Sequence, residues 1–200
     1  MGTTPLSAET RTRILDAAWS QVLEHGTGGV SVKAIAEAAG VSRQLVYFHF
    51  RNRAGLLTAM ARHRDATRGF VARVTAAEAL PPAPALAALL RAWCLYLPEI
   101  LPVARALEAA HITGDEGGEA WRDRMDGLRE TIAAGVDRVA RDGGLAAGWS
   151  AETAADWLWA ELQPAAYAHL AAWRGWTAED YAERTVPALL GAVLASAART

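Results

Sequence analysis

The chain has 200 residues, 52% of them hydrophobic, which is enough to bury the core of one large or two small domains. Its formal net charge is −2, and its single cysteine, Cys94, excludes an intrachain disulfide and a cysteine-rich zinc site. No stretch of 18 uncharged apolar residues occurs, and Met1 to Ser7 lack the apolar core of a signal peptide. We therefore expect a soluble cytoplasmic protein without a membrane span, in which Cys94 is a buried, unreactive thiol.

The charge is distributed unevenly along the chain. Residues 1–74 hold 10 Lys/Arg against 5 Asp/Glu, a net of +5, and residues 75–200 hold 10 against 17, a net of −7. Such asymmetry is typical of a chain with one end that faces nucleic acid and another part with a different task. The alternative for the basic part is a solvated helix face without a partner.

Apolar residues recur at helical spacing throughout, and no alternating strand pattern is present, so the sequence predicts an all-α protein. Glycine and proline runs mark the ends of the segments, as at 26–29, 80–84 and 143–144, while Pro98 and Pro102 separate two further helices. Pro164 is expected to kink its helix. We expect about nine helices, over residues 7–25, 31–39, 42–50, 52–79, 85–97, 99–113, 119–141, 150–173 and 177–198.

The second and third of these helices form a close pair. Ser31 and Ser42 each suit a helix N-cap, because the hydroxyl can accept a hydrogen bond from a free backbone N–H. Gly40 follows the last apolar position of the first helix and predicts its end. Two short helices joined by such a turn make a helix-turn-helix, whose second helix fits the major groove of DNA. The buried positions are expected at Val32, Ile35, Ala36, Ala39, Val46 and Phe50.

The run from Ile14 to Leu57 resembles the N-terminal domain of the TetR family of one-component bacterial transcriptional regulators. The resemblance implies a three-helix DNA-binding domain over residues 1–55 and a helical effector-binding and dimerisation domain over residues 56–200, connected by the helix at about 52–79. The matching residues are Ile14 to Ala18, Gly26, Ser31, Val32, Ile35, Ala36, Ala39 to Ser42, Tyr47, Phe50, Asn52, Arg53, Leu56 and Leu57.

The resemblance implies that the first domain binds double-stranded operator DNA. Arg43 could donate two bonds to guanine O6 and N7, and Gln44 could pair with adenine in the same way. Tyr47, one turn further on, is expected to reach a phosphate. The resemblance also implies a phosphate contact at Arg53, the family's basic position. The full set of expected DNA contacts is Ser31, Lys33, Ser42, Arg43, Gln44, Leu45, Tyr47, His49 and Arg53.

Three positions depart from the family pattern. Gln44 and Leu45 stand where a small pair, often glycine-threonine, is usual, and Phe48 replaces the usual histidine, with His49 next. The operator sequence can therefore not be carried over from the family. Leu45 either touches a thymine methyl or packs inside the domain, and we favour packing, because apolar helix residues usually do.

Aromatic residues dominate the second domain, since residues 80–200 hold seven of the eight tryptophans. Pockets for small ligands are mostly apolar and aromatic with a few polar groups. We expect a small apolar or aromatic effector of unknown identity, although aromatic residues at helical spacing are also what a plain core contains. The expected effector site consists of Trp93, Tyr96, His111, Trp121, Gln163 and Tyr167.

A homodimer is expected because recognition helices in pairs, about 34–36 Å apart, read two half-sites. The resemblance implies a four-helix interface made by the last two predicted helices of each copy. The expected interface residues are Trp157, Leu158, Leu162, Leu170, Val186, Leu189, Leu190, Val193 and Leu194.

The sequence thus favours a DNA-binding regulator, by family analogy a repressor associated with the nucleoid, that an effector releases from a palindromic operator. Two alternatives remain open. An all-α enzyme has no catalytic motif to support it, since Glu108 and His111 offer only two metal ligands. A helical dimeric scaffold without sequence-specific DNA binding would explain the altered pair at Gln44 and Leu45. We expect no cofactor and no metal site.

Overall fold

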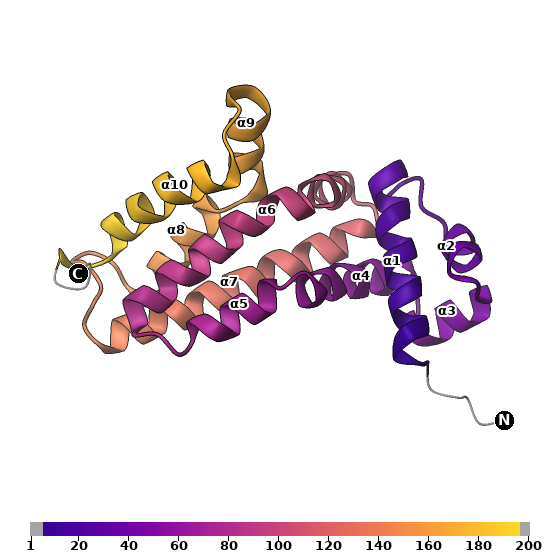
Figure 1. Ribbon diagram of the computed structural model, residues 1–200, viewed down its shortest axis with the longest axis horizontal. Helices are drawn as coiled ribbons and strands as arrows, with labels where there is room; N and C mark the ends of the chain where they lie inside the picture. The colour runs from indigo at the N-terminus through magenta and orange to yellow at the C-terminus, as the bar shows by residue number, and fades with distance from the viewer. Residues whose placement is uncertain (1–5, 197–200) are drawn as a thin grey trace. The chain divides into compact units, whose positions relative to one another are not determined.

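The computed structural model describes residues 6–196, so Met1 to Pro5 and the expected end of the last helix lie outside the described residues. Residues 6–196 form ten α-helices and no strand, apart from one isolated bridge between Leu145 and Leu194. The all-α prediction is confirmed. The helices are α1 (Ala8–His25), α2 (Val32–Ala39), α3 (Arg43–Phe50), α4 (Arg53–Thr67), α5 (Phe70–Ala77), α6 (Pro82–Thr113), α7 (Gly117–Arg141), α8 (Ala151–Glu161), α9 (Pro164–Arg174) and α10 (Ala178–Val193) (Figure 1).

The chain divides into two compact units. The first contains the chain up to Thr67 together with Pro102–Arg124, and the second contains Arg68–Leu101 and the chain from Met125 onward. The first unit therefore adds the end of α6 and the start of α7 to helices α1 to α4. The domain boundary expected at residue 55 stays a prediction.

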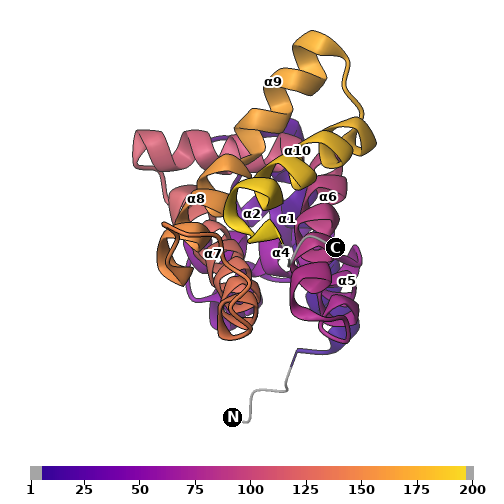
Figure 2. The same cartoon turned by 90° about the vertical axis from the view of Figure 1, so that its left-hand side faces the viewer.

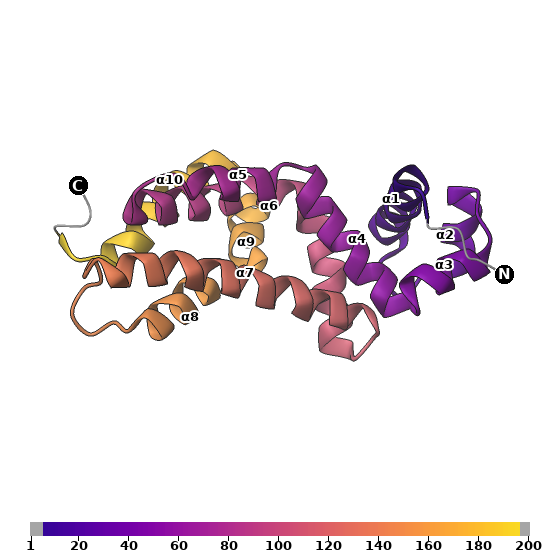
Figure 3. The same cartoon turned by 90° about the horizontal axis from the view of Figure 1, so that it is seen from below.

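In the first unit, α1 packs against both α2 and α4, and α3 packs against α2 and α4 (Figure 3). The core of this unit is aliphatic, and α1 and α4 also meet through charged groups. The Arg64 guanidinium lies 4.4 Å from the centre of the Trp19 ring, and the His63 ring is 3.8 Å from the Asp16 carboxylate. The fully buried side chains include Ile14, Leu15, Ile35, Leu56, Leu57 and Met60.

Local hydrogen bonds set the ends of the two short helices, as their sequences predict. The Ser31 hydroxyl accepts from Ala34 N–H and the Ser42 hydroxyl accepts from Leu45 N–H, both at 3.1 Å. Gly40 ends α2 in the left-handed conformation with φ of 67°, which a residue with a Cβ rarely adopts. The turn between α2 and α3 therefore follows directly from Gly40 and Ser42.

The prediction of one helix over residues 52–79 is wrong, because this segment forms two helices, α4 and α5. Gly69 lies between them with φ of 77°, a left-handed conformation that interrupts the helical hydrogen bonds. No proline and no run of glycines accompanies Gly69, so the periodic pattern alone did not reveal the break.

The separation expected at Pro98 and Pro102 is also wrong, since α6 continues through both. An interior proline costs about 3 kcal/mol relative to alanine, because it lacks the N–H and crowds the preceding turn. The two prolines lie one turn apart and both are exposed, while the buried stripe of Leu97, Val103 and Leu107 continues past them. Packing of that stripe outweighs the local cost.

Pro164, expected to kink a helix over 150–173, instead divides it. α8 ends at Glu161 and α9 starts with Pro164 at its first position, where the missing N–H costs nothing. Figures 1 and 2 show α9 pointing away from the other helices of the second unit. The last helix keeps its expected start, because Thr177 and Asp180 form a capping box.

The core of the second unit combines aliphatic residues of α6, α7 and α8 with aromatic rings. Cys94 is fully buried, as expected, and burial raises the pKa of its thiol to about 12. A thiol that stays protonated at neutral pH is a poor nucleophile. The fully buried side chains here include Leu86, Leu90, Leu97, Ile132 and Leu158.

Helix α6 is apolar and long enough to cross a membrane by composition alone, with a mean hydropathy of 1.4 in its most apolar window. Half of that window is buried inside the protein, and one such helix is weak evidence for a membrane span.

Candidate nucleic-acid interface

Helix α3 has a buried side and an exposed side. Val46 is 1% exposed and Phe50 is 5% exposed, so these two residues attach the helix to the rest of the first unit. The Arg11 guanidinium of α1 lies over the Phe50 ring, 5.1 Å from its centre. The orientation of α3 is thereby fixed by residues that take no part in its exposed surface.

The exposed side carries polar residues that suit base and phosphate contacts. Arg43 and Gln44 are exposed, and Tyr47 is 48% exposed. Arg43 and Gln44 lie on the first turn and Tyr47 lies one turn further along the same side of the helix. Leu45 is half-buried and Ser42 uses its hydroxyl as a cap, so both have a role in holding the helix.

The start of α2 adds a second group of polar atoms. Ser31 caps the helix, and Lys33 is 67% exposed at the side chain. Lys33 lies 3.7 Å from the Glu37 carboxylate, one turn further along α2. Such exposed pairs contribute little, about 0.3–0.5 kcal/mol, so the ammonium group stays accessible to a stronger partner.

Arg53 lies inside the first unit and not on its exposed side, which differs from the expected phosphate contact. Its Nη1 lies 3.3 Å from each Asp115 carboxylate oxygen and 3.7 Å from a Glu116 oxygen, and its Nη2 donates to the Thr27 carbonyl. The side chain is only 18% exposed. The guanidinium therefore joins the start of α4 to the α1–α2 turn and to the turn before α7.

His49 also lies deeper than expected. It is half-buried, and its Nε2 atom is buried without a hydrogen-bond partner. Its ring contacts Phe48 edge to face, with the centres 4.9 Å apart. Only part of the imidazole therefore reaches solvent.

Two exposed residues of this region were missed by the sequence reasoning. Phe48 is 58% exposed. Arg51, directly after α3, is exposed and has φ of 64°, a conformation that costs a residue with a Cβ free energy. A basic side chain next to the recognition helix was the available signal for Arg51, whereas only burial could reveal Phe48.

Further ion pairs connect α4 to the start of α7 within the first unit. The Arg62 guanidinium pairs with Asp123, whose hydrogen bond and charge raise the pKa of Arg62. Arg124 pairs with Asp65, which is 8% exposed. Arg62 of the basic segment is therefore paired with a carboxylate of the same unit although its side chain is 64% exposed, whereas the Arg124 side chain is 25% exposed.

The expected effector residues do not form one cluster. Trp93 and Tyr96 meet Phe70, which stacks on Tyr96 with ring centres 5.2 Å apart. Trp93 Nε1 donates to the Leu162 carbonyl at 2.8 Å, so its polar atom is already engaged. The remaining expected residues are separate: Tyr167 contacts Tyr181, Gln163 donates to the Trp159 carbonyl, and His111 (exposed) and Trp121 (buried) belong to the first unit.

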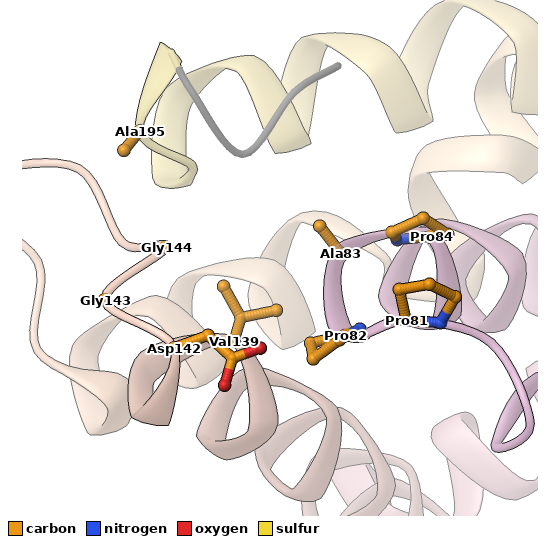
Figure 4. A pocket seen from close by; sticks show the side chains of 9 residues that line it. All are labelled: Pro81, Pro82, Ala83, Pro84, Val139, Asp142, Gly143, Gly144 and Ala195. Atoms are coloured by element: carbon orange, nitrogen blue, oxygen red, sulfur yellow. The ribbon is translucent and has the colours of Figure 1, made fainter.

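A cavity of about 330 Å³ lies in the second unit, between the start of α6 and the end of α7 (Figure 4). Prolines and backbone line most of it, and Asp142 supplies its only charged side chain. None of the expected effector residues lines this cavity, and it contains no aromatic ring. Its lining consists of Pro81, Pro82, Ala83, Pro84, Val139, Asp142, Gly143, Gly144 and Ala195.

Most of the expected dimer residues are already covered by their own chain. Leu158, Leu162 and Val193 are 0% exposed, and Leu194 is 2% exposed. Val186 and Leu189 are each 6% exposed. Trp157, Leu170 and Leu190 are half-buried and keep apolar surface. The interface assignment stays a prediction, and these last three residues are the ones that could meet a partner.

Comparisons with known proteins agree with this geometry. Residues 14–60 match the family model described as bacterial regulatory proteins, tetR family. The HTH-type transcriptional regulator TtgR of Pseudomonas putida is 36% identical over 70 residues, which is 35% of this chain and 33% of that protein. The match therefore spans about a third of this curated relative.

Solved structures extend the likeness of the fold to nearly the whole chain. A putative TetR-family regulator from Rhodococcus sp. has a TM-score of 0.74 at 22% identity, covering 92% of this chain and 97% of that one. Native NalD, the secondary repressor of the MexAB-OprM multidrug efflux pump in Pseudomonas aeruginosa, has a TM-score of 0.70 at 24% identity, covering 95% and 100%. The helix-turn-helix and the family match thus agree over residues 14–60, and nearly the whole chain shares the fold of these solved regulators.

Proposed function

We propose that this protein is a DNA-binding transcriptional regulator that places α3 in the major groove. The observation that carries the proposal is that α3 has a buried side and an exposed side. Val46 and Phe50 are buried, while Arg43, Gln44 and Tyr47 are exposed. Arg43 and Gln44 would read base edges, and Tyr47, Lys33 and the α2 N-terminus would contact phosphates. Arg51 joins the phosphate contacts in this proposal.

The same proposal includes repression that an effector relieves. NalD, which shares the fold, is by its description a repressor of an efflux pump, and this relation is the support for repression here. An effector can release DNA only if it binds the two conformations of the protein with different affinity. The effector in this proposal is a small apolar or aromatic molecule, and the cluster of Phe70, Trp93 and Tyr96 is its candidate contact.

A homodimer completes the proposal, because two recognition helices are needed for two half-sites. Trp157, Leu170 and Leu190 are the expected interface residues that keep exposed apolar surface. Burial of such side chains against a second copy would stabilise the dimer by about 25 cal/mol for each Å² of apolar surface removed from water.

DNA binding is tested first by fluorescence anisotropy with labelled DNA from upstream of the protein's own gene, over a series of salt concentrations. We expect tight, salt-sensitive and selective binding by the wild type. Arg43→Ala combined with Tyr47→Ala should reduce the affinity to the level of unrelated DNA, because each of the two half-sites loses a base contact of Arg43, worth about 1–3 kcal/mol, and a phosphate contact of Tyr47. Arg91→Ala, which removes an exposed charge from the second unit, is the matched control and should bind normally. Selective binding that survives the double substitution would contradict the proposed interface.

Arg53 should behave as an internal residue. Arg53→Gln is expected to lower the free energy of unfolding by about 1–3 kcal/mol, since charged hydrogen bonds to Asp115 and Thr27 are lost. The slope of log affinity against log salt should not change, because no phosphate contact is removed. Arg51→Gln is the comparison, with unchanged stability and a slope smaller by about one. Urea unfolding and anisotropy measure both quantities. If Arg53→Gln had a smaller slope of log affinity against log salt at unchanged stability, Arg53 would contact a phosphate, as the sequence analysis expected.

The dimer is tested with Leu190→Arg, which puts a charge on a half-buried position of α10. We expect sedimentation velocity to show a dimer for the wild type and a folded monomer for the variant, with circular dichroism as the check on folding. Val193 is unsuitable for this purpose, because it is fully buried and an arginine there would disrupt the chain itself. An intact dimer of Leu190→Arg would remove Leu190 from the interface.

A further inference from the structure

One apolar side chain of α3 is mostly exposed to solvent. Phe48 is 58% exposed, although burial of a phenylalanine stabilises a protein by about 1.5–3 kcal/mol. A single exposed apolar residue is common on protein surfaces and carries no meaning alone. Phe48 differs from such residues because of its neighbours on the same short helix.

Phe48 lies one turn after Gln44, so their side chains share one face of α3. Tyr47 and Arg43 border this face, and Val46 and Phe50 point to the core instead. The Phe48 ring also contacts the His49 ring edge to face, with ring centres 4.9 Å apart. The exposed face of the helix therefore presents an aromatic ring next to an amide.

The surroundings of this face are basic, as a surface that binds a polyanion requires. Residues 42–53 include three arginines and no aspartate or glutamate. Arg43 and Arg51, at either end of α3, are both exposed. A polyanion that also offers a small apolar group matches this combination of charges and ring.

The major groove offers one such apolar group, the C5-methyl of thymine, which phenylalanine is able to contact. A glutamine that pairs with adenine stands at the same edge of an A·T pair as a thymine methyl. We propose that Phe48 is a specificity-determining residue, which packs on a thymine methyl beside the adenine that Gln44 reads. This inference rests on the proposed function and adds to it a requirement for an A·T pair in each half-site.

The test uses the full-length protein and a duplex that it binds selectively. Each thymine of the half-site is replaced in turn by uracil, which keeps every hydrogen-bonding group and lacks only the methyl. At one position or at two adjacent positions, the wild type should lose affinity about fourfold, the factor for one buried methyl-sized group. Phe48→Ala should bind the thymine duplex more weakly than the wild type does. It should bind the uracil duplex as well as it binds the thymine duplex, so the fourfold loss of affinity with uracil disappears.

Two matched variants make the result specific. Phe48→Leu keeps an apolar contact and should keep the sensitivity to uracil. Arg43→Ala should bind more weakly and still lose about fourfold with uracil, because it leaves the ring in place. Circular dichroism and the unfolding curve confirm that each variant is folded, which is expected because neither side chain is buried.

The outcomes separate the two claims. If a selectively bound duplex exists and no uracil substitution weakens binding, the role of Phe48 is overturned while DNA recognition by α3 stands. The same holds if Phe48→Ala remains as sensitive to uracil as the wild type. If no duplex is bound selectively by the folded protein, both this inference and the proposed function are overturned.

Discussion

The burial of Val46 and Phe50 is the constraint on which the exposed face of α3 depends. A helix of eight residues is too short to be stable alone in water, because nucleation is costly and isolated helices need about 12–15 residues. Packing against α2 and α4, the Ser42 cap and the Arg11 contact to Phe50 supply what the helix lacks. Since the side chains used for packing are not those that face solvent, the exposed residues are free to differ between relatives without loss of the fold.

Paired charges inside the first unit support this arrangement. Arg53 connects the start of α4 to Thr27 and to Asp115, and Arg124 pairs with the buried Asp65. A partly buried charge is costly without a partner, so each of these arginines is committed to the fold. The consequence is a separation of roles among the basic residues, in which the exposed Arg43, Arg51 and Lys33 remain available to a polyanion.

The sequence predicted the first three helices well, because Gly26, Gly40, Ser31 and Ser42 act through local hydrogen bonds and backbone conformation. It was less successful where packing between distant residues decides, as at the exposed prolines of α6. Arg53 is the clearest case in the candidate interface: its partner Asp115 is 62 residues away, so no local pattern could reveal the pair. Leu158 and Val193 were assigned to a dimer interface as apolar residues of the last two predicted helices, and apolar character cannot distinguish a core position from a contact with a second copy.

The central claim is that the exposed face of α3 selects a DNA sequence. Selection from random DNA with the wild type, in parallel with Arg43→Ala combined with Tyr47→Ala, tests it most directly. The account predicts that the wild type enriches an inverted repeat with half-sites about 10–10.5 base pairs apart, or a multiple of that spacing, and that the variant enriches nothing. Failure of the folded wild-type protein to enrich any sequence, or enrichment of the same repeat by the variant, would contradict the account.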